Sequence, residues 1–92
     1  MNNLFISYDL NNPGQNYAAA IDTIKSLGSW AKVQKSFWYV KSNFSAEQAI
    51  EKISTKIDKN DSLIVIDVSN RNVSWRGLSD EVAAHIKGQW IK

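Results

Sequence analysis

The first part of the chain alternates a β-rich run with a stretch of helical spacing. Residues 4–9 (LFISYD) are rich in strand-forming side chains that divide between two faces, and the turn signal Asn11-Asn12-Pro13-Gly14 follows them. From residue 16 to residue 27 the apolar positions recur every three or four residues, which predicts a helix. Gly28 stands where a left-handed C-terminal cap would lie.

The middle of the chain predicts further strands and a second helix. Residues 30–41 (WAKVQKSFWYVK) are β-rich and too long for one ordinary strand. They predict either two strands around Gln34-Lys35-Ser36 or a single bulged ribbon. Ser45 and Gln48 then match the capping-box pattern, and a second helix is expected to run to about Asp58.

The last third predicts a strand, a polar loop and a helix. Residues 62–68 (SLIVIDV) are apolar on both faces, as in a covered central strand or a strand buried in a dimer. Residues 69–77 form a polar loop. Ser79 is expected to cap a final helix that runs through Trp90.

The predicted order is β-α-β-β-α-β plus a C-terminal helix, which is the α+β arrangement of ferredoxin-like domains. The sheet would be antiparallel with the order 4-1-3-2, and right-handed crossovers would place both main helices on one of its faces. The other face also carries apolar residues. It therefore needs a cover, either a second copy of the chain or the C-terminal helix.

Composition narrows the class of protein further. Ninety-two residues, 43% hydrophobic and 22% charged, predict one domain over residues 1–92, with a small core that a partner subunit could complete. The absence of cysteine excludes disulfides and thiolate metal sites, and the lone histidine, His85, excludes a multi-histidine metal cluster. No run approaches the roughly 20 apolar residues of a membrane span, so we expect no membrane partner and a cytoplasmic protein. A net charge of +2 permits an anionic partner without requiring one.

Several short segments together resemble a known group of ferredoxin-like proteins. They are residues 6–10 (ISYDL), 33–37 (VQKSF) and 57–63 (IDKNDSL). In this order they resemble the small subunit of CRISPR adaptation, the partner of the spacer integrase, whose superfamily includes the VapD-like ribonucleases. With DLNNPG, FWYVKS and the late WRGLSDE added, nearly the whole chain looks more like the SinR-like branch of that superfamily.

The resemblance implies a homodimer whose sheets face each other and, in some members, divalent-metal-dependent cleavage of RNA or DNA. It also implies that the acidic residue ending the first strand, here Asp9, binds the metal. Two departures concern the adaptation subunits. They have basic residues soon after that aspartate, where this chain has Asn11-Asn12-Pro13-Gly14, and they end in a strand that engages the integrase, where this chain is expected to end in a helix. These departures argue against a spacer-integrase partner.

Asp9 is also the leading catalytic and metal-binding candidate on chemical grounds. Carboxylates gathered at a two-fold axis could hold Mg²⁺ or Mn²⁺ through hard oxygen ligands and leave positions open for phosphate and water. The alternative is that Asp9 caps the following turn. Antiparallel pairing of the first and last strands would bring Asp61 near Asp9, which makes Asp61 a second catalytic candidate; its alternative role is turn formation.

The stretch from residue 25 to residue 41 mixes lysines with aromatic rings and contains no acid. Ammonium groups bind phosphates and exposed rings stack on bases, so Lys32, Lys35, Trp30 and Tyr39 are candidates for binding nucleic acid. Ordinary packing competes with this interpretation. Successive side chains of a strand alternate, so at least one set of rings must lie in the core or in a dimer interface.

The loop before the last helix supplies a third candidate site. Arg71 and Arg76, beside the amides at the start of that helix, could hold a phosphate or a nucleotide. The alternative is that Trp75 anchors the loop on the core while both arginines are solvated. The acidic residues of the first helical turn favour this alternative, because they would repel an anion.

The sequence therefore predicts a homodimer that binds RNA, DNA or a phosphate-containing ligand such as a nucleotide, with metal-dependent phosphodiester cleavage attached to Asp9. A rival interpretation is a non-catalytic interaction or nucleotide-sequestering module of phage, toxin-like or regulatory type. The sequence does not choose between them.

Overall fold

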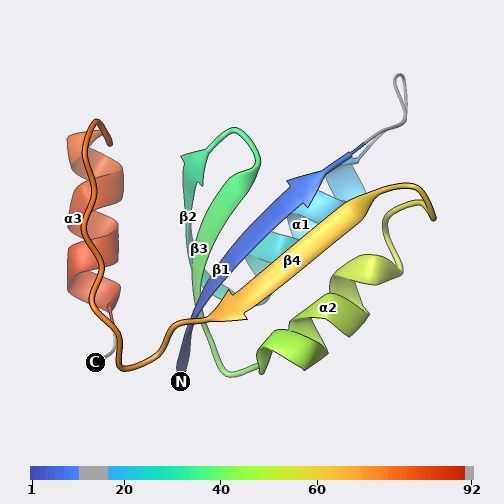
Figure 1. Cartoon of the computed structure of the whole chain (residues 1–92), viewed down its shortest axis with the longest axis horizontal. Helices are drawn as coiled ribbons and strands as arrows, with labels where there is room; N and C mark the ends of the chain where they lie inside the picture. Colours follow the sequence, from blue (N-terminus) through green and yellow to red (C-terminus); the bar gives the residue numbers. More distant parts are fainter. Residues whose placement is uncertain (11–16, 91–92) are drawn as a thin grey trace.

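A computed structural model describes residues 1–10 and 17–90 of the chain (Figure 1). Within these residues the chain forms four strands and three helices, in the order β1 (Asn2–Asp9), α1 (Ala18–Ser26), β2 (Gly28–Gln34), β3 (Phe37–Ser42), α2 (Ala46–Ser54), β4 (Ser62–Asp67) and α3 (Asp80–Gln89). The predicted α+β class and the predicted order of elements are confirmed. The predicted turn at Asn11-Asn12-Pro13-Gly14 lies outside the described residues.

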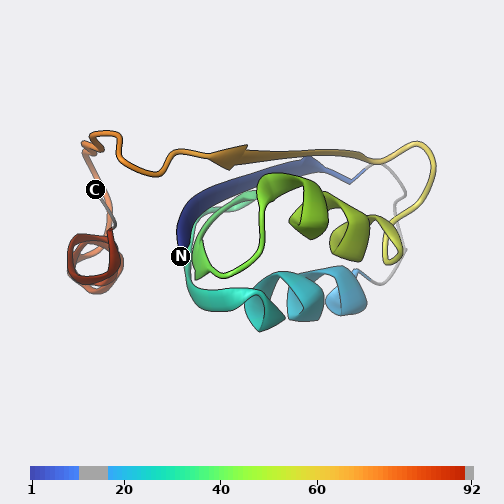
Figure 2. The same ribbon diagram turned by 90° about the horizontal axis from the view of Figure 1, so that it is seen from below.

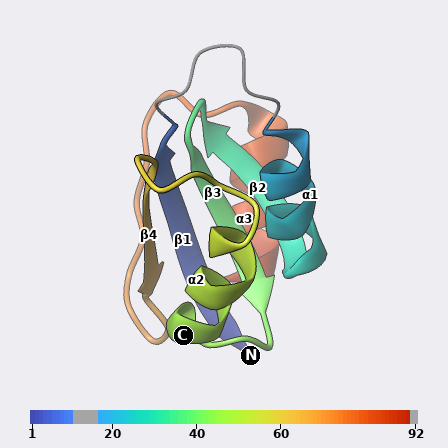
Figure 3. The same cartoon turned by 90° about the vertical axis from the view of Figure 1, so that its right-hand side faces the viewer.

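The strands form one antiparallel sheet with the order β2-β3-β1-β4, which is 4-1-3-2 when read from the β4 edge. Figure 3 shows α1 and α2 in front of this sheet and α3 behind it. In Figure 2, α1 and α2 lie side by side under the sheet while α3 stands apart from them. The sheet thus has helices on both faces.

The core lies between the sheet and the helices α1 and α2. Strand β1 runs through the middle of the sheet, and its Leu4 and Ile6 are fully buried on this face. Helix α1 contributes Ile24 and α2 contributes Ile53, each buried to 1% exposure. Full burial of one such aliphatic side chain is worth about 1.5–3 kcal/mol, so this layer supplies much of the stability of a small domain. The buried core residues are Leu4, Ile6, Ile24, Leu27, Trp38, Val40, Ala49 and Ile53.

Local signals in the sequence fix where α2 and α3 begin. The Ser45 hydroxyl oxygen accepts a hydrogen bond from the Gln48 backbone N–H at 3.1 Å, and the Gln48 side-chain oxygen accepts one from the Ser45 N–H at 2.9 Å. The predicted capping box is therefore confirmed. Helix α2 ends at Ser54, earlier than the predicted Asp58. Ser79 caps α3 as predicted, because its hydroxyl oxygen accepts from the Val82 N–H.

Helix α3 covers the β2–β3 half of the second sheet face. Its Ile86 is buried, and the Trp90 ring that follows it lies 5.7 Å from the Phe5 ring and 5.6 Å from the Tyr39 ring, centroid to centroid. The cover does not extend over β4, where Ile64 and Ile66 are 56% and 42% exposed. The apolar run at residues 62–68 is therefore an edge strand, and within one chain one of its faces is open.

Gly28 has a different role from the predicted helix cap. Helix α1 ends on Leu27 in a right-handed conformation, and Gly28 is already the first residue of β2. A methyl group built on Gly28 would overlap the carbonyl oxygen of Lys41 and lie 3.1 Å from the Ser42 Cα atom in the neighbouring strand. The Ser42 hydroxyl in turn donates to the Leu27 carbonyl oxygen at 2.7 Å. Gly28 is therefore required by the close approach of β3 to the end of α1.

We expect the substitution Gly28→Ala to lower the free energy of unfolding by about 3 kcal/mol, because the added methyl group has to displace backbone atoms of β3. Gly88→Ala is the matched control. Gly88 lies in α3, where a methyl group would have nothing within 4 Å, so alanine should stabilise the chain by about 0.5–1 kcal/mol. Urea unfolding of the three proteins measures both values. Equal stability of Gly28→Ala and the parent would contradict the close-approach argument.

Candidate nucleic-acid interface

Two tryptophans meet at the outer edge of the sheet, on the face that α1 and α2 cover. The strand register pairs Trp30 with Val40 and Lys32 with Trp38, so these side chains share one face. The Trp38 ring is buried and its indole N–H donates to the Tyr8 hydroxyl at 3.1 Å. The Trp30 ring lies against it at 5.5 Å between centroids, yet Trp30 remains 41% exposed. Trp38 thus supports a second ring that solvent can reach.

Lysines from two elements stand over these rings. The Lys25 Nζ atom, in the last turn of α1, is 4.7 Å from the Trp30 centroid and 6.0 Å from the Trp38 centroid. The Lys32 Nζ atom, on β2, is 5.7 Å from the Trp38 centroid. Ammonium groups at these distances are attracted by the ring faces. We call Lys25, Trp30, Lys32 and Trp38 the Trp30 corner.

The Trp30 corner combines the groups that a single-stranded nucleic acid requires. A half-exposed indole offers a surface on which a base can stack, and adjacent ammonium groups offer charge for the flanking phosphates. A pocket of about 270 Å³ adjoins the corner between β2 and α3, and both Lys32 and Glu81 line it. Because Glu81 would repel phosphate on that side, the α1 side near Lys25 is the more favourable path for a polyanion.

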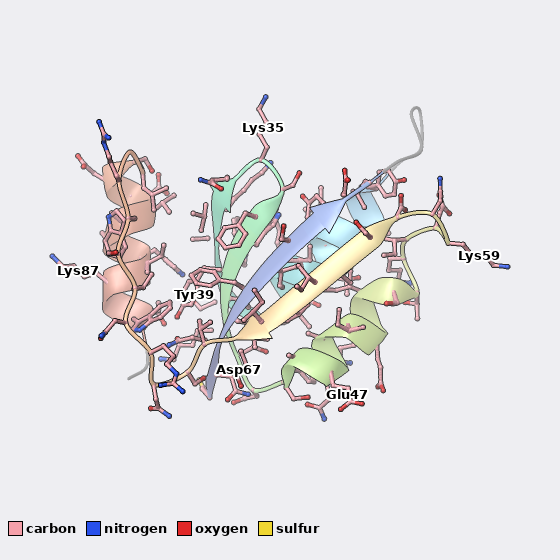
Figure 4. The ribbon with its side chains drawn as sticks, in the orientation of Figure 1. Lys35, Tyr39, Glu47, Lys59, Asp67 and Lys87 are labelled. Carbon is pink, nitrogen blue, oxygen red and sulfur yellow. The ribbon has the colours of Figure 1, made fainter. Side chains whose placement is uncertain are left out.

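The other predicted phosphate-binding residues do not gather at this corner. Lys35 lies at the tip of the turn between β2 and β3 and points away from the sheet (Figure 4). Arg71 and Arg76 belong to residues 68–79, which run beside α3 (Figure 1). The Arg71 carbonyl oxygen accepts from the Trp90 indole N–H at 2.8 Å, and Arg76 lines a pocket with Phe37 on the opposite sheet face from Lys32. The predicted cluster is thus divided between two faces.

Tyr39 lies inside the protein, so the prediction that its ring stacks on a base is wrong. Its ring is fully buried under α3, and Figure 4 shows it pointing toward that helix. The hydroxyl donates to the Asn3 side-chain oxygen at 2.8 Å. The Asn3 backbone N–H donates to the Ser69 hydroxyl oxygen, whose own hydrogen goes to Asp67. Tyr39 therefore joins β3 to β1 and to the segment that leads to α3.

The two predicted catalytic carboxylates lie at the same end of the sheet in different environments. Asp9 is exposed and is paired in register with Ser62, so alternation along the strands places Asp61 on the other face from Asp9. Both Asp61 oxygens accept hydrogen bonds, one from the Tyr17 hydroxyl at 2.9 Å and the other from the Asp58 N–H at 2.8 Å. Asp61 therefore closes a turn and ties it to the start of α1.

The described residues contain no ready-made cluster of acidic metal ligands. Over residues 1–10 and 17–90, no group of three histidine or acidic side chains is close enough together to hold an ion. The two Asp61 oxygens already accept hydrogen bonds from the Tyr17 hydroxyl and from the Asp58 N–H. The metal predicted at Asp9 stays a prediction.

Lys25 is the charged member of the Trp30 corner that sequence reasoning does not select as a binding residue. It belongs to the acid-free stretch, but it lies on a helix, and only the packing of α1 against β2 brings it over Trp30. A basic residue in the last turn of a helix directly before an edge strand is the available signal.

Comparison of the chain with protein-family models, with curated proteins and with solved structures gave no match. In the part of the chain that the structure describes, no helix has the length and apolar character needed to cross a bilayer.

Tyr39 should make the stability of the protein depend on alkaline pH. Burial raises the pKa of its hydroxyl from 10.0 to about 12. Below pH 10 the phenol is neutral in both states, whereas between pH 10 and 12 the unfolded chain alone loses the proton, so folding weakens by up to about 3 kcal/mol. Urea unfolding at pH 9 to 12 should show this loss in the parent. The Tyr39→Phe variant, although less stable at neutral pH, should lack this part of the slope, and equal slopes would contradict the assignment.

Proposed function

We propose that the chain binds single-stranded nucleic acid at the Trp30 corner, with a base stacked on Trp30 and neighbouring phosphates at Lys25 and Lys32. The observation that supports this most is the 41% exposure of an indole with ammonium groups close to its ring and to the ring beneath it. The contact of an exposed indole ring with water is unfavourable, and a stacked base would remove that apolar surface from water.

A single strand fits this arrangement better than a duplex does. Bases within a duplex are already stacked on one another, and their faces are not open to a protein ring. A splayed single strand offers each base face, and its backbone follows a line of positive charge. Ring stacking and phosphate contacts are common to all nucleotides, so the binding is expected to tolerate sequence and to accept RNA or DNA.

The proposal predicts a specific pattern of variants in a fluorescence anisotropy titration with an eight-nucleotide oligo(U) or oligo(dT). Trp30→Ala should weaken binding about tenfold or more, because a stacked base is worth about 1–3 kcal/mol, and Trp30→Phe should restore part of that loss. Lys25→Gln and Lys32→Gln should each reduce the slope of log K against log salt by about 0.7, since each removes one phosphate contact.

Lys59→Gln is the matched control for charge. Lys59 is exposed in the turn before β4, at the far side of the sheet from α3 (Figure 4), and its loss changes the net charge by the same amount. Its salt slope should equal that of the parent protein. If Lys59→Gln changed the salt slope as much as Lys32→Gln does, binding would depend on the net charge of the protein alone. The Trp30 corner would then be discarded as the site.

We further propose that the chain is a homodimer of the SinR-like type, in which β4 of one copy faces the second copy. Ile64 and Ile66 are the apolar side chains left open on that face, and Asp9 lies on the same face by alternation from Ser7, the register partner of Ile64. Burying the isoleucines in a two-fold interface would bring the Asp9 carboxylates of both copies toward each other. Such a pair is what an Mg²⁺ or Mn²⁺ site for phosphodiester cleavage would need.

Sedimentation and cleavage assays test this second proposal together. The parent should sediment as a dimer at 100 μM, and Ile64→Lys should sediment as a monomer, since it places a charge in the apolar contact. Labelled single strands should be cut with Mn²⁺, spared with chelator, and spared by Asp9→Asn. A monomeric parent would overturn the dimer. A dimer that binds without cutting would support the rival, non-catalytic interaction module.

A further inference from the structure

A second pocket lies on the sheet face opposite the Trp30 corner, under the segment of residues 68–79. It has a volume of about 200 Å³. Most of its wall is apolar and comes from the sheet, from that segment and from α3. Its lining includes Phe5, Val33, Phe37, Leu78, Ile86 and Arg76.

The size of the pocket suits a single ring. An apolar cavity of about 150 Å³ in a protein is large enough to take benzene, so 200 Å³ leaves room for one six-membered ring with a small substituent. Aromatic rings already stand at its wall, since the Phe5 and Phe37 rings are stacked with centroids 4.9 Å apart. A flat ligand can continue that packing in an offset or edge-on arrangement.

The charge of the pocket selects an anion. Arg76 is the charged residue among the side chains that line it, and no carboxylate of the described residues forms an ion pair with it. Gln34 and Ser74 add polar groups at the same wall. A guanidinium presents N–H donors in a planar fork that matches a carboxylate. Arg76 is exposed, so a ligand can reach its guanidinium from solvent.

We propose that this pocket binds a small aromatic carboxylate, with its ring in the apolar wall and its carboxylate on Arg76. The site is separate from the Trp30 corner, and it does not depend on the proposed nucleic-acid binding. A pyrimidine nucleotide shares the same chemistry, a ring with an anionic group. It carries a ribose between the two, which would hold the anionic group farther from the seated ring than the carboxylate of an aromatic acid lies.

Titration of the ¹⁵N-labelled protein followed by NMR tests the proposal, because the indole N–H signals separate the two faces. Benzoate should move the Trp75 signal, since Trp75 lines this pocket, and should leave the Trp30 signal in place. A ligand of this size should have a dissociation constant of about 1–10 mM. Benzamide, which keeps the ring without the charge, and acetate, which keeps the charge without the ring, should each bind at least about tenfold more weakly.

Variants locate the carboxylate and the ring. Arg76→Gln should weaken benzoate binding about tenfold, whereas the control Arg71→Gln, in the same segment but outside the pocket wall, should leave it unchanged. Val33→Phe should abolish binding by filling the pocket, with the remaining spectrum showing that the chain is folded. Uridine monophosphate is the second anionic probe and should not move the Trp75 signal.

Several results would overturn the proposal. They are benzamide binding as tightly as benzoate, unchanged binding in Arg76→Gln, or a Trp30 shift equal to that of Trp75. Uridine monophosphate binding here in place of benzoate would also overturn it and would assign the pocket to a nucleotide. The Trp30 signal reports on the other face of the sheet. The benzoate results therefore do not depend on whether the chain binds nucleic acid at the Trp30 corner.

Discussion

The structure depends on a central strand that is apolar on both faces. Strand β1 has hydrogen-bonded neighbours on either side, and it presents Leu4 and Ile6 to one face of the sheet and Phe5 to the other. Both faces must therefore be kept from water. Helices α1 and α2 cover the first, and α3 with the preceding segment covers part of the second. The two candidate sites and the open face of β4 follow from how far these helices and the segment before α3 extend over the sheet.

The two candidate sites arise where these covers end. On the first face, α1 stops one residue before β2, so Lys25 and Trp30 project at the sheet edge beyond the closed core. On the second face, the segment of residues 68–79 runs beside α3, and a pocket lined by Phe37 and Arg76 is left between this segment and the sheet. The open isoleucines of β4 have the same origin, because α3 packs on the far half of the sheet.

Local patterns are sufficient to predict the elements, and contacts between distant residues explain where prediction stops. The capping box at Ser45 and the cap at Ser79 depend on a few successive residues, and both are predicted correctly. The prediction for Gly28 is wrong because a glycine after a helix has the same appearance whether it caps that helix or avoids a neighbouring strand. The prediction for Tyr39 fails because its burial depends on α3, which begins some forty residues later. The Trp30 corner is half predicted, since Trp30 and Lys32 share a strand while Lys25 comes from a helix.

The order of the strands also determines how the sheet can assemble. Among the paired strands that the structure describes, only β2 and β3 follow each other in sequence; the register joins Leu4 of β1 to Asp67 of β4, 63 positions away. Loop-closure entropy opposes such distant pairing until the intervening residues have become compact. During synthesis, β1 emerges before the other three strands, and its partner β4 emerges only after β2 and β3. Strand β1, at the centre of the finished sheet, is therefore one of the last strands to be fully paired. Until then its apolar side chains stay exposed to water.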